Sequence, residues 1–200
     1  MNKIVWLEVE TKVRIKNVNS LRKKIKKIAR FQKKETRGDD YFALHRRFRK
    51  YAYPKKAFRI RRKPDKFEVN FKKHLKKYWD SEIVVKQEFE FVLKDQKDVD
   101  NLLALFFDLG FVQWMKKRKT SESYLHKKDK RIIIEINHVA HLGYFMEIEY
   151  LAQPSEMKKA KKKIHDTLRE LEIDPKDVDN TGYTKRLHDK GIKDKRYWVK

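Results

Sequence analysis

Several stretches of the chain alternate apolar and polar residues, a pattern typical of β-strands with one buried face. In LEVETKVRI (7–15), one side carries leucine, valine and isoleucine, while the other carries two glutamates, a lysine and an arginine. VVKQEFEFVL (84–93) and YFMEIEYL (144–151) show a similar alternation. We therefore expect strands at Lys3–Val13, Asp39–Leu44, Ala57–Arg62, Lys66–Lys72, Ile83–Leu93, Val112–Lys119, Ser121–Lys127, Arg131–Val139 and Tyr144–Leu151.

A helical period appears between these stretches. NSLRKKIKKIARF (19–31), DVDNLLALFFDLGF (98–111) and PSEMKKAKKKIHDTLRELEI (154–173) each place apolar residues on one side, and a short helical stretch is expected at Tyr183–Leu187. Ser20 is the expected N-cap of the first helix, and Gly110 ends the second. Because no Gly/Ser-rich or Pro-rich linker interrupts the pattern, we expect a single domain over 1–200, with a core at about 3–187 and a basic tail at 188–200.

Composition narrows the class of partner. Of the 200 residues, 40% are hydrophobic and 41% are charged, and the formal net charge is +24. Such a chain can bury a core, and its partner is expected to be anionic unless the charge reflects a lysine-rich proteome. We expect a cytoplasmic protein, since no signal peptide or membrane-length apolar run is evident and the chain has no cysteine.

The charged faces of the strands allow two interpretations. In an ordinary antiparallel sheet they would face water. If the sheet closes into a barrel, they would instead line a lumen, and buried charges there would have to be paired or bound to a ligand. The lumen would then contain the carboxylates Glu8, Glu10, Glu88, Glu90, Glu147 and Glu149 and the cations Lys12, Arg59, Arg61, Lys72, Lys86, Lys116 and Arg118.

Such a lumen suits a metal ion and a phosphate chain. Two carboxylates at Glu-x-Glu spacing point the same way, roughly 6.6 Å apart. Facing pairs of this kind would form an all-oxygen site for Mg²⁺ or Mn²⁺. Surrounding arginine and lysine side chains would neutralise a polyphosphate, so the pattern indicates phosphoryl chemistry.

In this order, the motifs resemble those of the CYTH superfamily, the triphosphate tunnel metalloenzymes that include class IV adenylyl cyclases and thiamine triphosphatases. The signature Glu-x-Glu-x-Lys is similar to Glu8, Glu10 and Lys12. Further segments that resemble family motifs are DDYFAL, AFRIR, VNFK, KQEFE, INHVAHLGYFMEIE and GYTKRL, and the family's K-x-R strand is similar to Lys116 and Arg118. The resemblance extends over about residues 3–187.

The resemblance implies an α+β fold, a closed eight-stranded antiparallel β-barrel that forms a triphosphate tunnel, with helices packed outside. The implied metal ligands for Mg²⁺ or Mn²⁺ are Glu8, Glu10, Glu147 and Glu149. The implied triphosphate-binding residues are Lys12, Arg59, Arg61, Lys72, Lys86, Lys116 and Arg118, with Lys12 or Lys72 assisting proton transfer. Glu88 and Glu90 would bind a second metal or support the basic residues through salt bridges.

Two departures from the family pattern affect this assignment. Asn137 stands where the family has an acidic metal ligand, and Glu135 precedes it on the same strand face. We expect Glu135 to replace that ligand in part, beside Asn137; the alternative is a salt bridge from Glu135 to a neighbouring lysine or arginine. Cyclases of this class often carry an aromatic and histidine element near the N-terminus, whereas MNKIVW contains no histidine, which favours hydrolysis over cyclisation.

Three functions remain open on the sequence. The first is metal-dependent hydrolysis of a nucleoside, thiamine or inorganic triphosphate. The second is a class IV adenylyl cyclase that converts ATP to cyclic AMP and pyrophosphate. The third is a non-catalytic basic protein that binds polyphosphate or nucleic acid, which the high charge and the segment LRKKIKKIARFQKK favour. We expect a monomer or homodimer with no membrane partner.

Overall fold

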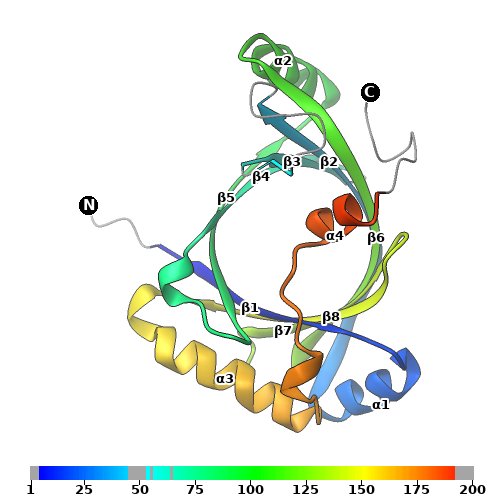
Figure 1. The fold of residues 1–200 in the computed structure, drawn as a ribbon, viewed down its shortest axis with the longest axis vertical. Coiled ribbons are helices and arrows are strands. Elements are labelled where there is room, and N and C mark those ends of the chain that lie inside the picture. Colours follow the sequence, from blue (N-terminus) through cyan, green and yellow to red (C-terminus); the bar gives the residue numbers. More distant parts are fainter. Residues whose placement is uncertain (1–4, 45–52, 55, 64, 192–200) are drawn as a thin grey trace.

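The computed structural model describes residues 5–44, 53–54, 56–63 and 65–191, and these form a closed antiparallel barrel of eight strands (Figure 1). The strands are β1 (Leu7–Arg14), β2 (Ala29–Leu44), β3 (Phe58–Arg62), β4 (Phe67–His74), β5 (Val84–Leu93), β6 (Phe111–His126), β7 (Ile132–Val139) and β8 (Gly143–Ala152). The helices are α1 (Val18–Ile28), α2 (Gln96–Asp108), α3 (Met157–Glu170) and α4 (Tyr183–Asp189). The expected α+β barrel is therefore confirmed.

Around the barrel the strands follow the order β1-β5-β4-β3-β2-β6-β7-β8, and β8 pairs with β1 to close the ring. The β1–β8 register sets Glu10 opposite Glu149 and Lys12 opposite Glu147. Because side chains alternate between the faces of a strand, this register directs all four charged groups to the same side, the lumen.

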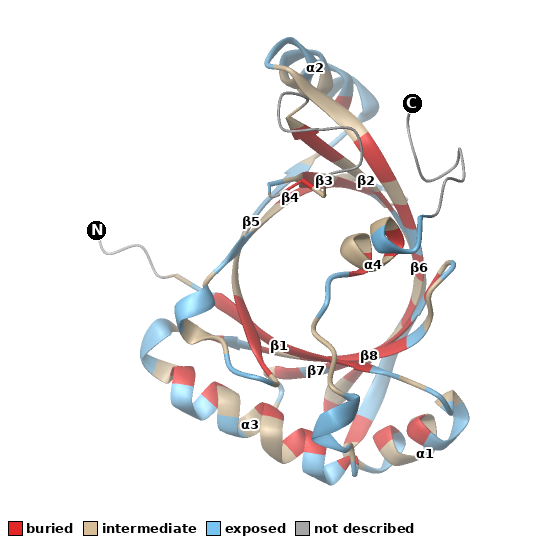
Figure 2. Cartoon of the chain, viewed as in Figure 1, coloured by how far each residue is buried: buried red, intermediate tan, exposed pale blue. Residues whose placement is uncertain are grey.

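The apolar faces pack outward against the helices. α1 and α3 cover one side of the barrel, where β1, β7 and β8 are mostly buried (Figures 1 and 2). Seven of the eight residues of β1 are buried, because α3 covers its outer face while the lumen encloses its inner face. α2 packs over a second apolar cluster on β2, β3 and β4, and α4 places Leu187 against Trp114 and Met115.

The strand expectations needed two corrections. The separate strands expected at Val112–Lys119 and Ser121–Lys127 form one strand, β6, and β2 begins ten residues before the expected Asp39. β2 and β6 pair along almost their whole length, so cross-strand hydrogen bonds hold segments that are polar on both faces. The N-cap of α1 is Asn17, which accepts a hydrogen bond from the Ser20 amide, and not Ser20 itself.

Two expected segments lie partly outside the described residues. Lys3 and Ile4, at the start of the first expected strand, are outside the description, as are residues 192–200 of the expected basic tail. Within the described ranges, no helix has the length and apolar character needed to cross a membrane.

Candidate functional site

The lumen holds a cavity of about 1070 Å³ to which every strand of the barrel contributes a side chain. Its lining is dominated by charged residues, in agreement with the closed-barrel interpretation of the strand faces. The solvated-sheet alternative is therefore wrong for these strands. The lining residues from the predicted set are Glu8, Glu10, Lys12, Arg59, Arg61, Lys72, Lys86, Glu88, Glu90, Glu135, Glu147 and Glu149.

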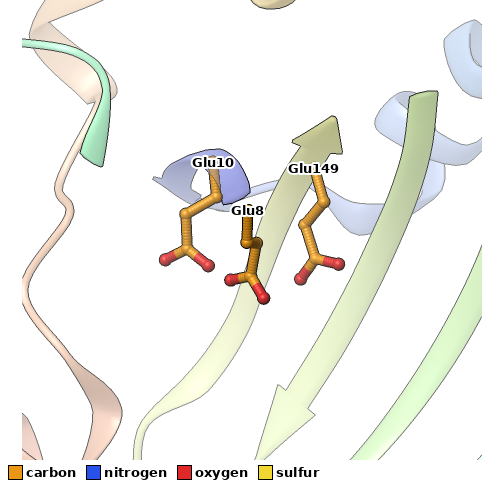
Figure 3. Close-up of side chains that lie close together, drawn as sticks. All are labelled: Glu8, Glu10 and Glu149. Atoms are coloured by element: carbon orange, nitrogen blue, oxygen red, sulfur yellow. The ribbon is translucent and has the colours of Figure 1, made fainter. Parts of the chain in front are cut away.

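The carboxylates of β1, β7 and β8 converge in two groups that share Glu149. One oxygen each of Glu8, Glu10 and Glu149 lie within 4.8 Å of one another, and the same holds for Glu135, Glu147 and Glu149. Figure 3 shows the first group, with the three carboxylates pointing toward the same space from β1 and β8. The structure thus brings together the four glutamates expected as metal ligands and Glu135, the expected partial replacement.

Glu149 has the most unfavourable electrostatic position in this cluster. Burial raises the pKa of its carboxyl, and Glu8, Glu135, Glu147 and Glu10 raise that pKa further, well above its usual range. Among the described residues, no lysine or arginine forms a salt bridge with Glu149. A bound cation would relieve this repulsion, and without one the carboxyl tends to keep its proton.

Lysines neutralise the first acidic group from the side of β4 and β5. Lys72 Nζ lies 3.1 Å from Glu8 and also pairs with Glu88. Lys86 Nζ pairs with Glu10 and lies 3.7 Å from Glu8. Burial alone would lower the pKa of Lys72, but Glu8 and Glu88 outweigh it and hold that pKa well above the usual value. Lys72 therefore stays charged.

Lys12 and Lys119 neutralise Glu147 in the second group. Their Nζ atoms lie 3.3 Å and 3.6 Å from the Glu147 carboxylate. Burial would raise the pKa of Glu147, but Lys119 and Lys12 hold it at about 2. The pKa of Lys12 is lowered because burial outweighs the attraction of Glu147 and Glu10, and its ammonium lies 4.3 Å from the ring centre of Tyr183.

Asn137 and Glu135 occupy the positions where the chain departs from the family pattern. Asn137 Nδ2 donates to Glu147 at 2.7 Å, and its Oδ1 accepts from Ser121 at 2.5 Å. Glu135 accepts from Ser123 at 2.9 Å and pairs with Lys119 and Arg37 at 3.2 Å and 3.4 Å. Glu135 is therefore both a member of an acidic group and a salt-bridge partner, so the two interpretations of it coexist in the structure.

Glu88 and Glu90 lie on β5, at the positions that pair with Lys72 and Asn70 of the neighbouring strand β4. Asn70 Nδ2 donates to Glu88 at 2.8 Å and to Glu90 at 3.2 Å. Glu88 also pairs with Lys72, which fits its expected supporting role. Neither residue belongs to the acidic groups found among the described residues.

A cationic cluster around Asp39 forms the opposite wall of the lumen. Arg61 Nε and Lys117 Nζ lie 2.7 Å and 2.9 Å from the fully buried Asp39 carboxylate, and Arg59 lies at 3.7 Å. These three cations hold the pKa of Asp39 well below its usual range, although burial would raise it. Arg59 Nε is buried without a hydrogen-bond partner in the described structure, so it has a free donor. This wall carries more positive than negative charge.

The predicted orientation of β6 is wrong. Lys116 and Arg118 do not line the cavity, and Arg118 is exposed to solvent. Lys117 and Lys119 line it instead, and both are buried. The segment KKRK gives no alternation from which the inward face can be chosen. Tyr124 packs in the core outside the lumen, so in a continuous strand its position indicates which residues of β6 face inward. Because two separate strands were expected here, the position of Tyr124 did not orient KKRK.

Sequence reasoning also missed Asp39, Arg37 and Lys117. Asp39 lies two residues before Tyr41, which lines the cavity, so the period of two from DDYFAL would have placed Asp39 on the inward face. Burial lowers the pKa of Lys117 to about 7 despite the nearby Asp39, and its Nζ donates to the Tyr41 hydroxyl at 2.8 Å. Arg37 lies in a stretch with no apolar alternation to orient it.

A family model for the CYTH domain matches residues 7–183. The chain belongs to the CYTH domain family. The resemblance is thereby confirmed. The matched range includes all eight strands of the barrel and the helices α1, α2 and α3. No curated protein sequence matches the chain.

Solved structures share the CYTH fold of this chain. PH1819 from Pyrococcus horikoshii OT3 is 28% identical, with a TM-score of 0.71, and the match covers 92% of this chain and 99% of that one. HpAC1 from Hippeastrum, an adenylyl cyclase candidate described as having a dominant triphosphatase activity, is 15% identical, with a TM-score of 0.62 and coverage of 92% and 96%. An adenylate cyclase candidate from Vibrio parahaemolyticus is 14% identical, with a TM-score of 0.69 and coverage of 90% and 97%. At these identities, the last two show the fold alone.

Proposed function

We propose that this CYTH protein is a divalent-metal-dependent hydrolase that releases phosphate from a nucleoside, thiamine or inorganic triphosphate. The observation that carries the proposal is one lumen in which carboxylates sharing Glu149 face a cationic wall around Arg59, Arg61 and Lys117. A metal and a phosphate chain need opposite charges at close range, and this lumen has both. Members of the family are metal-dependent triphosphatases or adenylate cyclases.

The residues present fit a Mg²⁺ or Mn²⁺ ion. The donors are all carboxylate oxygens, which hard divalent cations prefer, and Glu149 has a raised pKa and no salt bridge among the described residues. Glu8, Glu10 and Glu149 would hold the ion, with Glu147 and Glu135 beside them. When bound, the ion would neutralise phosphate oxygens and lower the pKa of a coordinated water.

The basic residues would bind and orient the substrate. Arg59, with its free Nε donor, and Arg61 would hold phosphate oxygens, assisted by Lys117 and Lys119. Lys72 and Lys86 would position Glu8 and Glu10 through their salt bridges. In hydrolysis, a water attacks the terminal phosphorus and the bond to the bridging oxygen breaks, which releases inorganic phosphate and a diphosphate.

Lys12 is better suited than Lys72 to take part in proton transfer during this reaction. Burial lowers the pKa of Lys12, whereas Glu8 and Glu88 keep the pKa of Lys72 well above its usual value. A group with a pKa nearer the working pH exchanges protons more readily. Lys72 is then a charged positioning residue.

Product analysis tests the reaction. ATP, thiamine triphosphate and inorganic triphosphate are incubated with the protein and Mg²⁺ or Mn²⁺, and the products are separated by ion-exchange chromatography. Hydrolysis gives phosphate with ADP, thiamine diphosphate or pyrophosphate. Cyclic AMP with pyrophosphate from ATP would instead establish the cyclase, and no metal-dependent product from any substrate would refute catalysis and favour a binding protein.

The matched control uses another glutamate that lines the lumen. Glu10→Gln removes a charge from the first acidic group, and we expect it to lower kcat at least 100-fold and to weaken Mn²⁺ binding measured by calorimetry. Glu68→Gln changes a buried glutamate outside both groups, one that pairs with Lys63 and Lys66, and should retain metal binding. Equal metal affinity in both variants would contradict the assignment.

We also propose that Glu135 takes part of the role lost at Asn137. Glu135→Gln should weaken Mn²⁺ binding about tenfold, while Asn137→Asp should strengthen it by adding a carboxylate beside Glu147. The salt-bridge interpretation predicts a lower melting temperature for Glu135→Gln with unchanged metal affinity and turnover. That result would exclude Glu135 as a ligand.

A further inference from the structure

The outer side of α1 has a cationic surface that the tunnel function does not use. From Lys16 to Lys34 the chain contains no aspartate or glutamate. Lys23, Lys26 and Lys27 are exposed and spaced i, i+3 and i+4, so they share one face of α1. Arg30 follows just after the helix and is exposed as well. We call these residues, with Lys127 and Phe31, the α1 surface.

The cations of this surface lie close together. Lys127 Nζ donates to the carbonyl oxygens of Lys26 and Lys27 at 3.0 Å and 2.7 Å, which places its charge at the C-terminal end of α1. Within the described ranges, no ion pair joins Lys23, Lys26, Lys27 or Arg30 to a carboxylate. Like charges at this spacing repel one another, so the surface attracts a partner with several negative charges.

The lysines of α3 show that a high net charge does not by itself leave lysines unpaired. α3 is also rich in lysine, yet Lys161, Lys162 and Lys163 pair with Asp80, Asp166 and Asp129 at 2.8, 2.9 and 3.3 Å. On α1, Arg22 and Lys24 also pair with glutamates of other elements, but Lys23, Lys26 and Lys27 form no ion pair within the described ranges. The charge on α1 is therefore a local feature and not only an average property of the chain.

Phe31 adds an aromatic group to this surface. Its side chain is 53% exposed, and its ring centre lies 5.5 Å from that of buried Tyr124, in an edge-to-face arrangement. The Tyr124 hydroxyl donates to Glu122, which pairs with Arg22 of α1, so Phe31 lies beside α1 on the outer face. An exposed aromatic ring fixed among cations is the arrangement that stacks an unpaired base next to bound phosphates.

The packing of α1 disfavours a lipid partner. Its apolar residues Leu21 and Ile25 are buried in the core against the barrel, so they are not available to enter a bilayer. Figure 1 shows α1 outside the barrel, on the side away from α2. A polyanion bound there would lie across the barrel wall from the triphosphate cavity.

We propose that the α1 surface binds single-stranded nucleic acid, with its lysines and Arg30 on phosphates and Phe31 stacked on a base. This binding is separate from the tunnel and does not depend on the proposed hydrolysis. For single strands, the logarithm of the affinity falls with the logarithm of the salt concentration by about 0.7 per phosphate contacted. Each lysine that binds a phosphate therefore contributes a measurable part of the salt slope.

The test measures binding of a labelled single-stranded RNA with a 5′-hydroxyl, roughly 12 nucleotides long, by fluorescence anisotropy at several salt concentrations. Replacing Lys23, Lys26 and Lys27 by Gln, which keeps helix propensity, should weaken binding more than tenfold and reduce the salt slope by about 2. Phe31→Ala should weaken binding about tenfold with the slope unchanged. The matched control replaces Lys158, Lys159 and Lys162 of α3 by Gln and should bind like the wild type.

Excess inorganic triphosphate separates this surface from the tunnel. It should leave the RNA bound, and triphosphate turnover should be the same in the α1 variants as in the wild type. Displacement of RNA by triphosphate, or equal losses in the α1 and α3 variants, would overturn the proposal. Absence of RNA binding, or Lys23- and Phe31-dependent binding only to anionic lipid vesicles, would overturn it too. Absence of turnover with intact RNA binding would refute the hydrolase alone.

Discussion

Glu149→Gln tests the acidic cluster through two effects of opposite sign. Glu149 belongs to both carboxylate groups, whose oxygens lie within 4.8 Å of one another. At an effective dielectric constant of about 20, two unit charges at that separation repel by roughly 3.5 kcal/mol, part of which the neighbouring lysines offset. Burial together with Glu8, Glu135, Glu147 and Glu10 therefore raises the pKa of Glu149 well above its usual range.

The raised pKa makes the stability of the metal-free protein depend on pH. Above about pH 4.3 the unfolded chain has released this proton, while the folded protein retains it until its own higher pKa is reached. The contribution of the protonated Glu149 carboxyl to the free energy of unfolding is therefore complete below about pH 4.3. Between that pH and the higher pKa of the folded protein, it is lost by about 1.4 kcal/mol per pH unit. This corresponds to roughly 3–6 °C in Tm per pH unit for a chain of this size.

Glutamine is nearly isosteric and carries no charge, so the metal-free Glu149→Gln protein should melt at a higher temperature than the wild type at pH 8 and at about the same temperature at pH 4. With Mn²⁺ at 100 times its Kd, the wild type should gain about 2.7 kcal/mol, and the variant should lose most of this gain. Differential scanning fluorimetry with and without EDTA measures both effects. Lower metal-free stability of the variant at pH 8, or an intact Mn²⁺ shift, would refute the reasoning.

Three further changes test other parts of the lumen. Asp39→Asn should lower the free energy of unfolding, measured in urea, by about 3–5 kcal/mol, because Arg61 and Lys117 lose a buried partner. The control Asp40→Asn should cost less than about 1 kcal/mol, because its partner Arg62 is largely exposed. Similar losses in both variants would contradict the buried cluster. Burial lowers the pKa of Lys117 to about 7, so Lys117 should gain a proton when a triphosphate binds. Calorimetry should therefore show that the affinity for triphosphate falls as the pH rises from 7 to 9, and Lys117→Arg should remove this dependence. A pH-independent affinity of the wild type would rule out this role of Lys117. Lys119→Gln should weaken triphosphate binding at least tenfold and Arg118→Gln less than twofold, because of these two only Lys119 faces the cavity. The reverse order of effects would show that the inward face of β6 is misassigned.

Much of the barrel could be predicted because its strands alternate strictly. In β1 and β8, the glutamates alternate with buried apolar residues, so burying the apolar face leaves the glutamates no orientation other than inward once the sheet closes. The same argument oriented Arg59 and Arg61 correctly, because Phe58 and Ile60 pack outward under α2. In these strands local pattern and global packing agree.

Tertiary structure alone decided the orientation of β6 and the extent of β2. KKRK and RFQKKETRGDD have polar residues at successive positions, so hydrophobicity selects neither face nor a boundary. Pairing of β2 with β6, interrupted by bulges, sets which lysines point inward, and this brings Lys117 and Asp39 together. The sequence by itself determined which carboxylates share a strand face. The closure of β8 onto β1 placed them in one cavity, because a register between distant strands depends on the packing of the whole barrel.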